Sequence, residues 1–200
     1  MNSIDKLAEI FARFPGIGPR QAKRFVYFLL SKNGDYSSEV VKAIESLKKE
    51  IIQCESCMRF FVGNGHKKQV CSICSDESRD DSMLMLVPRD IDFEAVERSS
   101  TYKGLYFILG GVVPILDKEP EKRIRLKELE SRIKKNKNLK EIILAMNANL
   151  DGENTAEFIK QKFKASTITF STLGRGLSTG SELEYADTET LKNAFLHRTK

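Results

Sequence analysis

Long apolar runs are missing from this sequence. No stretch approaches the roughly 20 apolar residues that cross a bilayer, and the start, MNSIDKLAEI, lacks the basic-then-apolar order of a secretion signal. Low-complexity tracts and internal repeats of fixed period are also missing. With 40% hydrophobic and 30% charged residues, the composition is that of an ordinary globular protein. These features argue against membrane, exported and disordered proteins, and we expect a cytosolic chain of one compact domain or a few small modules.

Excess positive charge is confined to the first third of the chain. Residues 1–75 contain 12 Lys and Arg against 7 Asp and Glu, whereas residues 76–200 contain 21 of each. Such a bias predicts that the N-terminal modules contact a polyanion, although a basic surface is often simply solvated.

The four cysteines form two pairs, CESC and CSIC, separated by 13 residues. Each C-x-x-C turn aims two thiolates at one point, so Cys54, Cys57, Cys71 and Cys74 predict a tetrahedral Zn²⁺ site. Four sulfur ligands leave no open position, which indicates a structural rather than a catalytic metal. A redox pair is the alternative, but such a pair usually occurs singly. His66, between the pairs, is interpreted as a solvated loop residue.

Two short helices are predicted on either side of the stretch FPGIGPRQAKRF, residues 14–25. Their apolar positions recur at helical spacing, and the proline and glycines interrupt the pattern between them. These positions are Leu7, Ile10, Phe11 and Phe14 before the turn and Ala22, Phe25, Val26 and Leu29 after it. The pattern is typical of a helix-hairpin-helix.

This hairpin is a candidate site for a DNA phosphate. Glycines let the backbone approach a phosphate closely, and the unpaired N–H groups at the start of the second helix favour an anion. The contacts would carry no base sequence, so binding should be nonspecific and salt-dependent. A packed helical corner with a glycine cap is the structural alternative. The predicted DNA contacts are Gly16, Gly18, Arg20, Lys23 and Arg24.

The remaining sequence predicts one more N-terminal helix and then an α/β domain. The helix covers residues 37–52, with Val40, Val41, Ile44, Leu47 and Ile51 facing inward. After the polar linker SDESRDDS, strands are expected at 83–87, 104–111, 141–146 and 166–170, and helices at 92–99, 121–135, 153–164 and 188–197. Strands that alternate with helices predict a parallel sheet covered on both faces.

The overall prediction is an α+β chain of several modules. They are a helix-hairpin-helix region (1–53), a four-cysteine zinc finger (54–75), an α/β domain (76–170) and a C-terminal glycine-rich loop with a helix (171–200).

Two carboxylates follow the strand EIILAM, at Asp151 and Glu153. Ligands of parallel sheets bind beyond the carboxyl ends of the strands, so these side chains could hold Mg²⁺. Helix capping by Asp151 is an equally good interpretation. The later glycine-rich loop, LGRGLSTGSELEYAD, lacks the G-K-[ST] ending of a P-loop, which argues against ATP hydrolysis.

Taken in order, these motifs resemble the bacterial RecR family of recombination mediators over essentially the whole chain. FPGIGPRQAKR and GSELEYAD are the most specific pieces. The resemblance implies that the α/β part is a Toprim domain and that the protein forms a ring, usually a tetramer, around DNA. It also implies action with RecO and RecF to load RecA onto single-stranded DNA.

The resemblance also assigns roles to individual positions. Lys23 and Arg24 fall in the DNA-contacting hairpin, the four cysteines on the zinc ligands, and Asp151 and Glu153 on acidic positions tied to RecO binding. Pro88 stands where the first Toprim strand usually ends in a glutamate, so a catalytic Mg²⁺ site is not favoured. Other departures are the insertion GNGHKK, with Lys67 and Lys68, and the serines Ser178 and Ser181.

We therefore expect a non-enzymatic, DNA-binding mediator that forms a homotetrameric ring or a dimer. The alternatives are a Mg²⁺-dependent Toprim nuclease, a topoisomerase or primase fragment, and a zinc-stabilised adaptor that binds only protein.

Overall fold

The computed structural model describes residues 1–63 and 69–198, which form two compact units, Met1–Ile52 and Gln53–Lys200. The four-cysteine segment and the α/β domain belong to the same unit. The predicted boundaries of the α/β domain, at residues 76 and 171, stay predictions.

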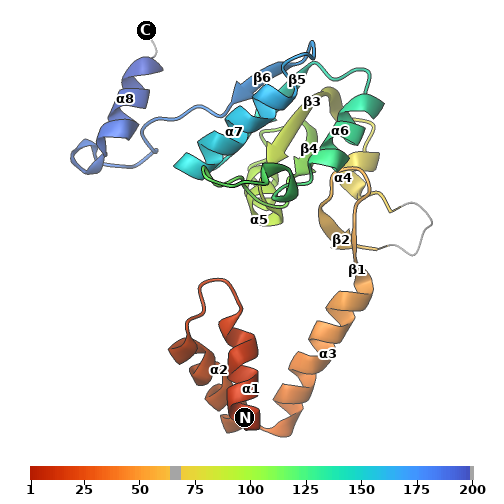
Figure 1. The fold of residues 1–200 in the computed structure, drawn as a ribbon, viewed down its shortest axis with the longest axis vertical. Coiled ribbons are helices and arrows are strands. Elements are labelled where there is room, and N and C mark those ends of the chain that lie inside the picture. Colours follow the sequence, from red (N-terminus) through yellow and green to blue (C-terminus); the bar gives the residue numbers. More distant parts are fainter. Residues whose placement is uncertain (64–68, 199–200) are drawn as a thin grey trace. The chain divides into compact units, whose positions relative to one another are not determined.

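The first unit is built on the helix pair α1 (Ser3–Ala12) and α2 (Pro19–Ser31), which pack against each other (Figure 1). Ala8, Ala22 and Val26 are buried between them. Two of these three side chains are alanines, which lets the helix backbones approach closely. The expected helix–turn–helix is confirmed, with the turn at residues 13–18.

Helix α3 (Gly34–Glu50) follows, and Asn33 caps it by accepting a hydrogen bond from the Tyr36 backbone N–H at 3.3 Å. The prediction that its apolar residues face inward is wrong for three of the five, whereas Val40 and Ile51 are partly buried. Val41, Ile44 and Leu47 are 55%, 59% and 59% exposed, and no residue of α3 is buried. Tyr36 at the start of α3 contacts α2, with 5.8 Å between its ring centroid and that of Phe28, but the apolar stripe further along α3 is left uncovered within this unit.

The second unit contains the predicted parallel sheet, with four strands in the order β4-β3-β5-β6 (Figure 1). In β3, one of the two inner strands, Leu86 pairs with Phe107 of β4 on one side and with Leu144 of β5 on the other. The last strand begins later than predicted, because its pairing starts where the Thr169 N–H donates to Lys140 O at 2.8 Å. The strands are β3 (Asp80–Val87), β4 (Gly104–Ile108), β5 (Glu141–Leu144) and β6 (Thr169–Thr172).

Both faces of the sheet are covered. Alternate residues of β3 point to opposite sides of the sheet, so they take part in two different cores. Leu84 and Leu86 pack in one core with residues of α6 (Leu126–Lys135) and α7 (Leu150–Lys162). Met85 and Val87 pack in a second core with residues of α5 (Asp90–Arg98) and three of the cysteines. The cysteine segment therefore occupies part of the sheet face that a helix would otherwise cover.

The remaining elements are short, apart from the C-terminal helix. The helix predicted at 121–135 begins only at Leu126, since the Arg125 N–H donates to Leu109 O at 2.8 Å before the helix starts. Among the described residues, no helix combines the length and apolar character that crossing a bilayer requires. These other elements are β1 (Ile51–Gln53), β2 (Phe60–Val62), α4 (Ser72–Ser75), the 3-10 turns Pro120–Lys122 and Leu183–Tyr185, and α8 (Thr188–Leu196).

Candidate metal centre and candidate nucleic-acid interface

The four predicted metal ligands come together. The Sγ atoms of Cys54, Cys57, Cys71 and Cys74 all lie within 4.8 Å of one another, and the Cys57 and Cys71 sulfurs are 3.7 Å apart. A tetrahedron with Zn–S bonds of about 2.3 Å has sulfurs about 3.8 Å apart. A disulfide would need sulfurs about 2.05 Å apart. The geometry therefore fits a metal ion held by four thiolates.

Backbone hydrogen bonds shape both cysteine turns. Met58 follows the first pair with a φ of 65°, and its N–H donates to Cys54 O at 2.9 Å. In the second pair, the Cys71 N–H donates to Cys54 Sγ at 3.4 Å. The hydrogen bond between Cys54 and Cys57 lowers the pKa of the Cys54 thiol and raises that of Cys57. A metal ion would deprotonate all four, because its positive charge favours the thiolates.

The cysteine segment is bound firmly to the sheet. The Ile108 N–H of β4 donates to Cys57 O at 2.8 Å. Arg125 donates to Met58 O and to Ile108 O, both at 3.1 Å, and the Phe60 N–H donates to Asp90 Oδ1 at 2.8 Å. The metal ligands are therefore part of the α/β core.

The hairpin turn has the open backbone that the sequence predicts. Gly16 has a φ of +76°, a conformation that favours glycine, and the Ile17 N–H donates to Phe14 O at 3.0 Å. Gly18 is the N-cap residue of α2, with a φ of −81°, and a Cβ added there would meet no described atom within 4 Å. Gly18 is therefore not required by packing or by backbone conformation.

The predicted basic residues lie on the first two turns of α2, directly after this open backbone. Arg20, Lys23 and Arg24 are all exposed. The Lys23 ammonium lies 3.5 Å from Asp5 Oδ1 of α1, and Arg24 Nη1 donates to Gln21 Oε1 at 3.4 Å. Asp5 was not predicted as part of this site. It places one negative charge beside the basic cluster.

The acidic residues lie in the first turn of α7, beyond the carboxyl end of β5. Asn149 caps this helix by accepting a hydrogen bond from the Gly152 N–H at 2.9 Å, so the capping role considered for Asp151 is wrong. Glu153 is paired with Arg175 of the following glycine-rich segment, with 2.6 Å between Oε1 and Nη1. The two side chains that were predicted as a pair are therefore in different environments.

The neighbouring strand end offers no carboxylate. Strand β3 ends in Leu86 and Val87, followed by Pro88, and all three are buried. Asp90 accepts the Phe60 N–H, and Asp92 is paired with Arg89 at 3.1 Å. The end of β3 therefore adds no carboxylate to Asp151 and Glu153.

Comparison with known families accounts for nearly the whole chain. A Toprim domain model matches residues 82–173, a "RecR, helix-hairpin-helix" model matches residues 4–48, and a "RecR, C-terminal" model matches residues 176–199. The recombination protein RecR of Staphylococcus saprophyticus is 39% identical over 98% of this chain and 96% of its own length. The chain belongs to the RecR family.

Other members of the family are similarly close. The proteins of the same name from Lactobacillus helveticus and Streptococcus mutans are 37% and 36% identical, each over 98% of this chain and 96% of their own length. The insertion predicted between the cysteine pairs stays a prediction for this RecR-family chain, and its residues His66, Lys67 and Lys68 lie outside the described residues.

The sequence did not reveal the polar residues that fix the first turn of α7 in this RecR-family chain. This turn carries Asp151 and Glu153, and we call it the acidic edge. Thr155 is fully buried. Its hydroxyl donates to Asp151 O at 2.6 Å and accepts the Val113 N–H at 2.8 Å. Asn154 donates to Val113 O at 2.9 Å. Single polar residues on a helix look like surface residues in sequence, and Val113, which both of these side chains contact, lies 42 and 41 positions away.

Proposed function

We propose that this chain is a non-enzymatic, DNA-binding mediator of recombinational DNA repair. The observation that carries the proposal is the similarity, over 98% of the chain, to proteins named recombination protein RecR, together with the open hairpin that precedes three basic residues. In this proposal the protein acts with RecO and RecF to load RecA onto single-stranded DNA.

The hairpin supports phosphate binding without base recognition. Because a Cβ at Gly18 would meet no described atom within 4 Å, a phosphate could approach the backbone there closely. The unpaired N–H groups at the start of α2 point out of the helix end, where the helix dipole favours an anion. Arg20, Lys23 and Arg24 add charge within two turns. Contacts of this kind are made to phosphate, so the affinity should depend on salt far more than on base sequence.

Assembly into a ring, as a homotetramer or a dimer, would let hairpins that each bind DNA weakly hold one DNA molecule together. The exposed apolar stripe of α3 supports a subunit interface, because Val41, Ile44 and Leu47 are more than half exposed. The C-terminal segment supports a second interface, since Tyr185 and Phe195 are 79% and 67% exposed. Several hairpins that face one DNA molecule would bind by multivalency.

The metal of the four-cysteine site is proposed to be structural Zn²⁺. Four sulfur donors favour Zn²⁺ and leave no position for a substrate. Loss of the ion should disturb the sheet as well as the two C-x-x-C turns, because the Ile108 N–H of β4 donates to Cys57 O.

The acidic edge is proposed to bind the partner RecO rather than to catalyse a reaction. Asp151 and Glu153 would supply the negative charge for this contact. The apolar end of β3 and the Glu153–Arg175 ion pair support a non-enzymatic role, and no observation favours a nuclease or topoisomerase.

DNA binding by the double variant Lys23→Ala, Arg24→Ala tests the proposal. Fluorescence anisotropy with a labelled single-stranded oligonucleotide should show weaker binding and a salt slope reduced by up to about 1.4, the value for two lost phosphate contacts on single strands. The double variant Lys42→Ala, Lys49→Ala, which removes two charges from the exposed surface of α3, is the matched control and should bind almost as the wild type does. Undiminished binding by the double variant would refute the hairpin as the DNA contact.

A further inference from the structure

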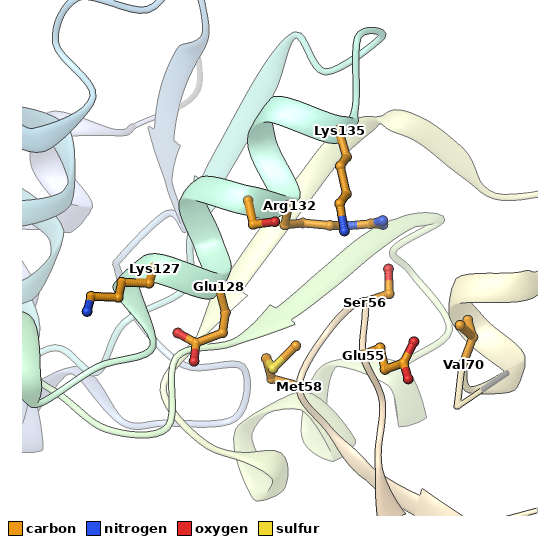
Figure 2. Close-up of a pocket in the computed structure, with 9 residues that line it drawn as sticks. Glu55, Ser56, Met58, Val70, Lys127, Glu128, Arg132 and Lys135 are labelled. Carbon is orange, nitrogen blue, oxygen red and sulfur yellow. The ribbon is translucent and has the colours of Figure 1, made fainter. Parts of the chain in front are cut away.

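A cleft separates the cysteine segment from α6, and two cations are positioned within it (Figure 2). Its volume is about 410 Å³. One wall is α6, which contributes Glu128, Arg132 and Lys135. The other wall is the cysteine segment, which contributes Glu55 and Ser56. We call this space the Arg132 cleft.

Arg132 is the unusual residue of the cleft. Its Nε is buried and has no hydrogen-bond partner among the described residues. Burying an unpaired donor of a charged group is costly, so such a group normally has a partner. Arg59 of the same unit also has a buried Nε without a hydrogen-bond partner among the described residues, but its guanidinium lies over the Phe93 ring, with 4.6 Å between Cζ and the ring centroid. Other arginines of this unit form ion pairs. Arg79 is bound to Glu97, Arg123 to Asp117 and Arg175 to Glu153.

Lys135 reinforces the positive charge at the same point. Both Lys135 and Arg132 line the Arg132 cleft, and both also line a neighbouring cavity beside Cys74. Figure 2 shows both side chains extending from α6 across the cleft, whereas Lys127 extends in another direction. Neither cation forms an ion pair within 4.0 Å among the described residues, although Glu55 and Glu128 line the same cleft.

A structural role explains only part of this arrangement. Cations in the last turn of a helix interact favourably with the helix dipole, and α6 ends with Arg132, Lys134 and Lys135. That effect would be satisfied by exposed side chains. It accounts for Lys135, which is exposed, but not for the Arg132 Nε, which is buried without a partner among the described residues. An oxyanion at the Arg132 guanidinium, within reach of the Lys135 ammonium, would supply that partner.

We propose that the Arg132 cleft binds a phosphate group, supplied by the backbone of single-stranded DNA. Arg132 would donate from its guanidinium, Lys135 would add a second charge, and the Ser56 hydroxyl is a further donor on the opposite wall. The assignment to a DNA phosphate rests on the proposed DNA-binding function. The phosphate site itself does not.

The first experiment titrates inorganic phosphate into the full-length, zinc-loaded, ¹⁵N-labelled protein. The Arg132 Nε–Hε resonance, assigned by through-bond experiments on ¹³C,¹⁵N-labelled wild-type protein, should shift and saturate in the millimolar range. Chloride at matched ionic strength should leave it unmoved. Because the wild-type protein carries this measurement, it decides the site even if Arg132→Gln folds poorly. A resonance that phosphate does not move would overturn the site.

The second experiment measures binding of single-stranded DNA by Lys135→Gln and by Arg132→Gln, Lys135→Gln. The double variant should bind roughly three- to tenfold more weakly, and its salt slope should fall by about 0.7 to 1.4. Lys134→Gln is the matched control, because it removes the same charge from the same helix turn outside both cavities. Equal affinities of the double variant and this control would overturn the DNA assignment and leave a site for free phosphate. A wild-type protein that does not bind DNA would refute the proposed function, while the phosphate titration would still decide the cleft.

Discussion

Replacing Gly152 with alanine should destabilise the α/β domain. This glycine lies between the two acidic residues, in the first turn of α7, where the chain folds back against the loop after β5. A Cβ at this position would lie 2.1 Å from Asn147 O and 3.0 Å from Asn147 C. Both atoms belong to the backbone, so no side-chain rotation can relieve the contact.

The size of the effect follows from what must move. Relief requires a shift of the first turn of α7 of roughly 1 Å, and overpacking of this kind costs about 1–3 kcal/mol. The shift also disturbs the cap, in which the Gly152 N–H donates to Asn149 at 2.9 Å, and the loss of such a cap costs about 1 kcal/mol. The expected loss in the free energy of unfolding is therefore roughly 2–4 kcal/mol.

Urea unfolding of the zinc-loaded protein, followed by circular dichroism, measures this loss. Thermal unfolding should agree, with a fall in Tm of about 2–4 °C per kcal/mol for a chain of this size. Gly174→Ala is the matched control, since a Cβ there would meet no described atom within 4 Å. A Gly152→Ala protein as stable as Gly174→Ala would refute the packing argument.

Three further outcomes are expected. Asp5→Asn should raise DNA affinity about twofold, because it removes a negative charge 3.5 Å from Lys23; anisotropy at low salt would show it, and an unchanged or lower affinity would contradict it. Removing the metal with a chelator should lower the unfolding midpoint of the whole α/β domain, since three cysteines belong to its core; a midpoint unchanged by circular dichroism would contradict this. Burial opposes ionisation of Glu97, but hydrogen bonds from Arg79 and Tyr106 outweigh it and lower its pKa below the ordinary 4.5. Its stabilisation is therefore present above about pH 4.5 and is lost as the pH falls through the lowered pKa. Glu97→Gln should show a shallower loss of stability in acid, and an identical acid-unfolding curve would argue against this pairing.

The candidate metal ligands could be predicted from sequence because their signals are local. Two C-x-x-C pairs specify tight turns, and the structure brings their sulfurs within 4.8 Å of one another. The hairpin was equally predictable, since Gly16 needs a positive φ that few other residues adopt easily. The parallel sheet followed from the alternation of apolar strands with helices, and its order β4-β3-β5-β6 only became known from the structure.

Tertiary structure decided the features that depend on distant partners. The same periodicity that predicted a buried face for α3 leaves Val41, Ile44 and Leu47 exposed, because amphipathicity does not say what covers an apolar stripe. Which segments the fold brings together decides that Glu153 pairs with Arg175, and that the Arg132 Nε has no hydrogen-bond partner in the described part of the chain. Turn chemistry and periodicity act over a few residues and can be read in the sequence. Pairing of charges and covering of surfaces act through space, so only the folded chain determines them.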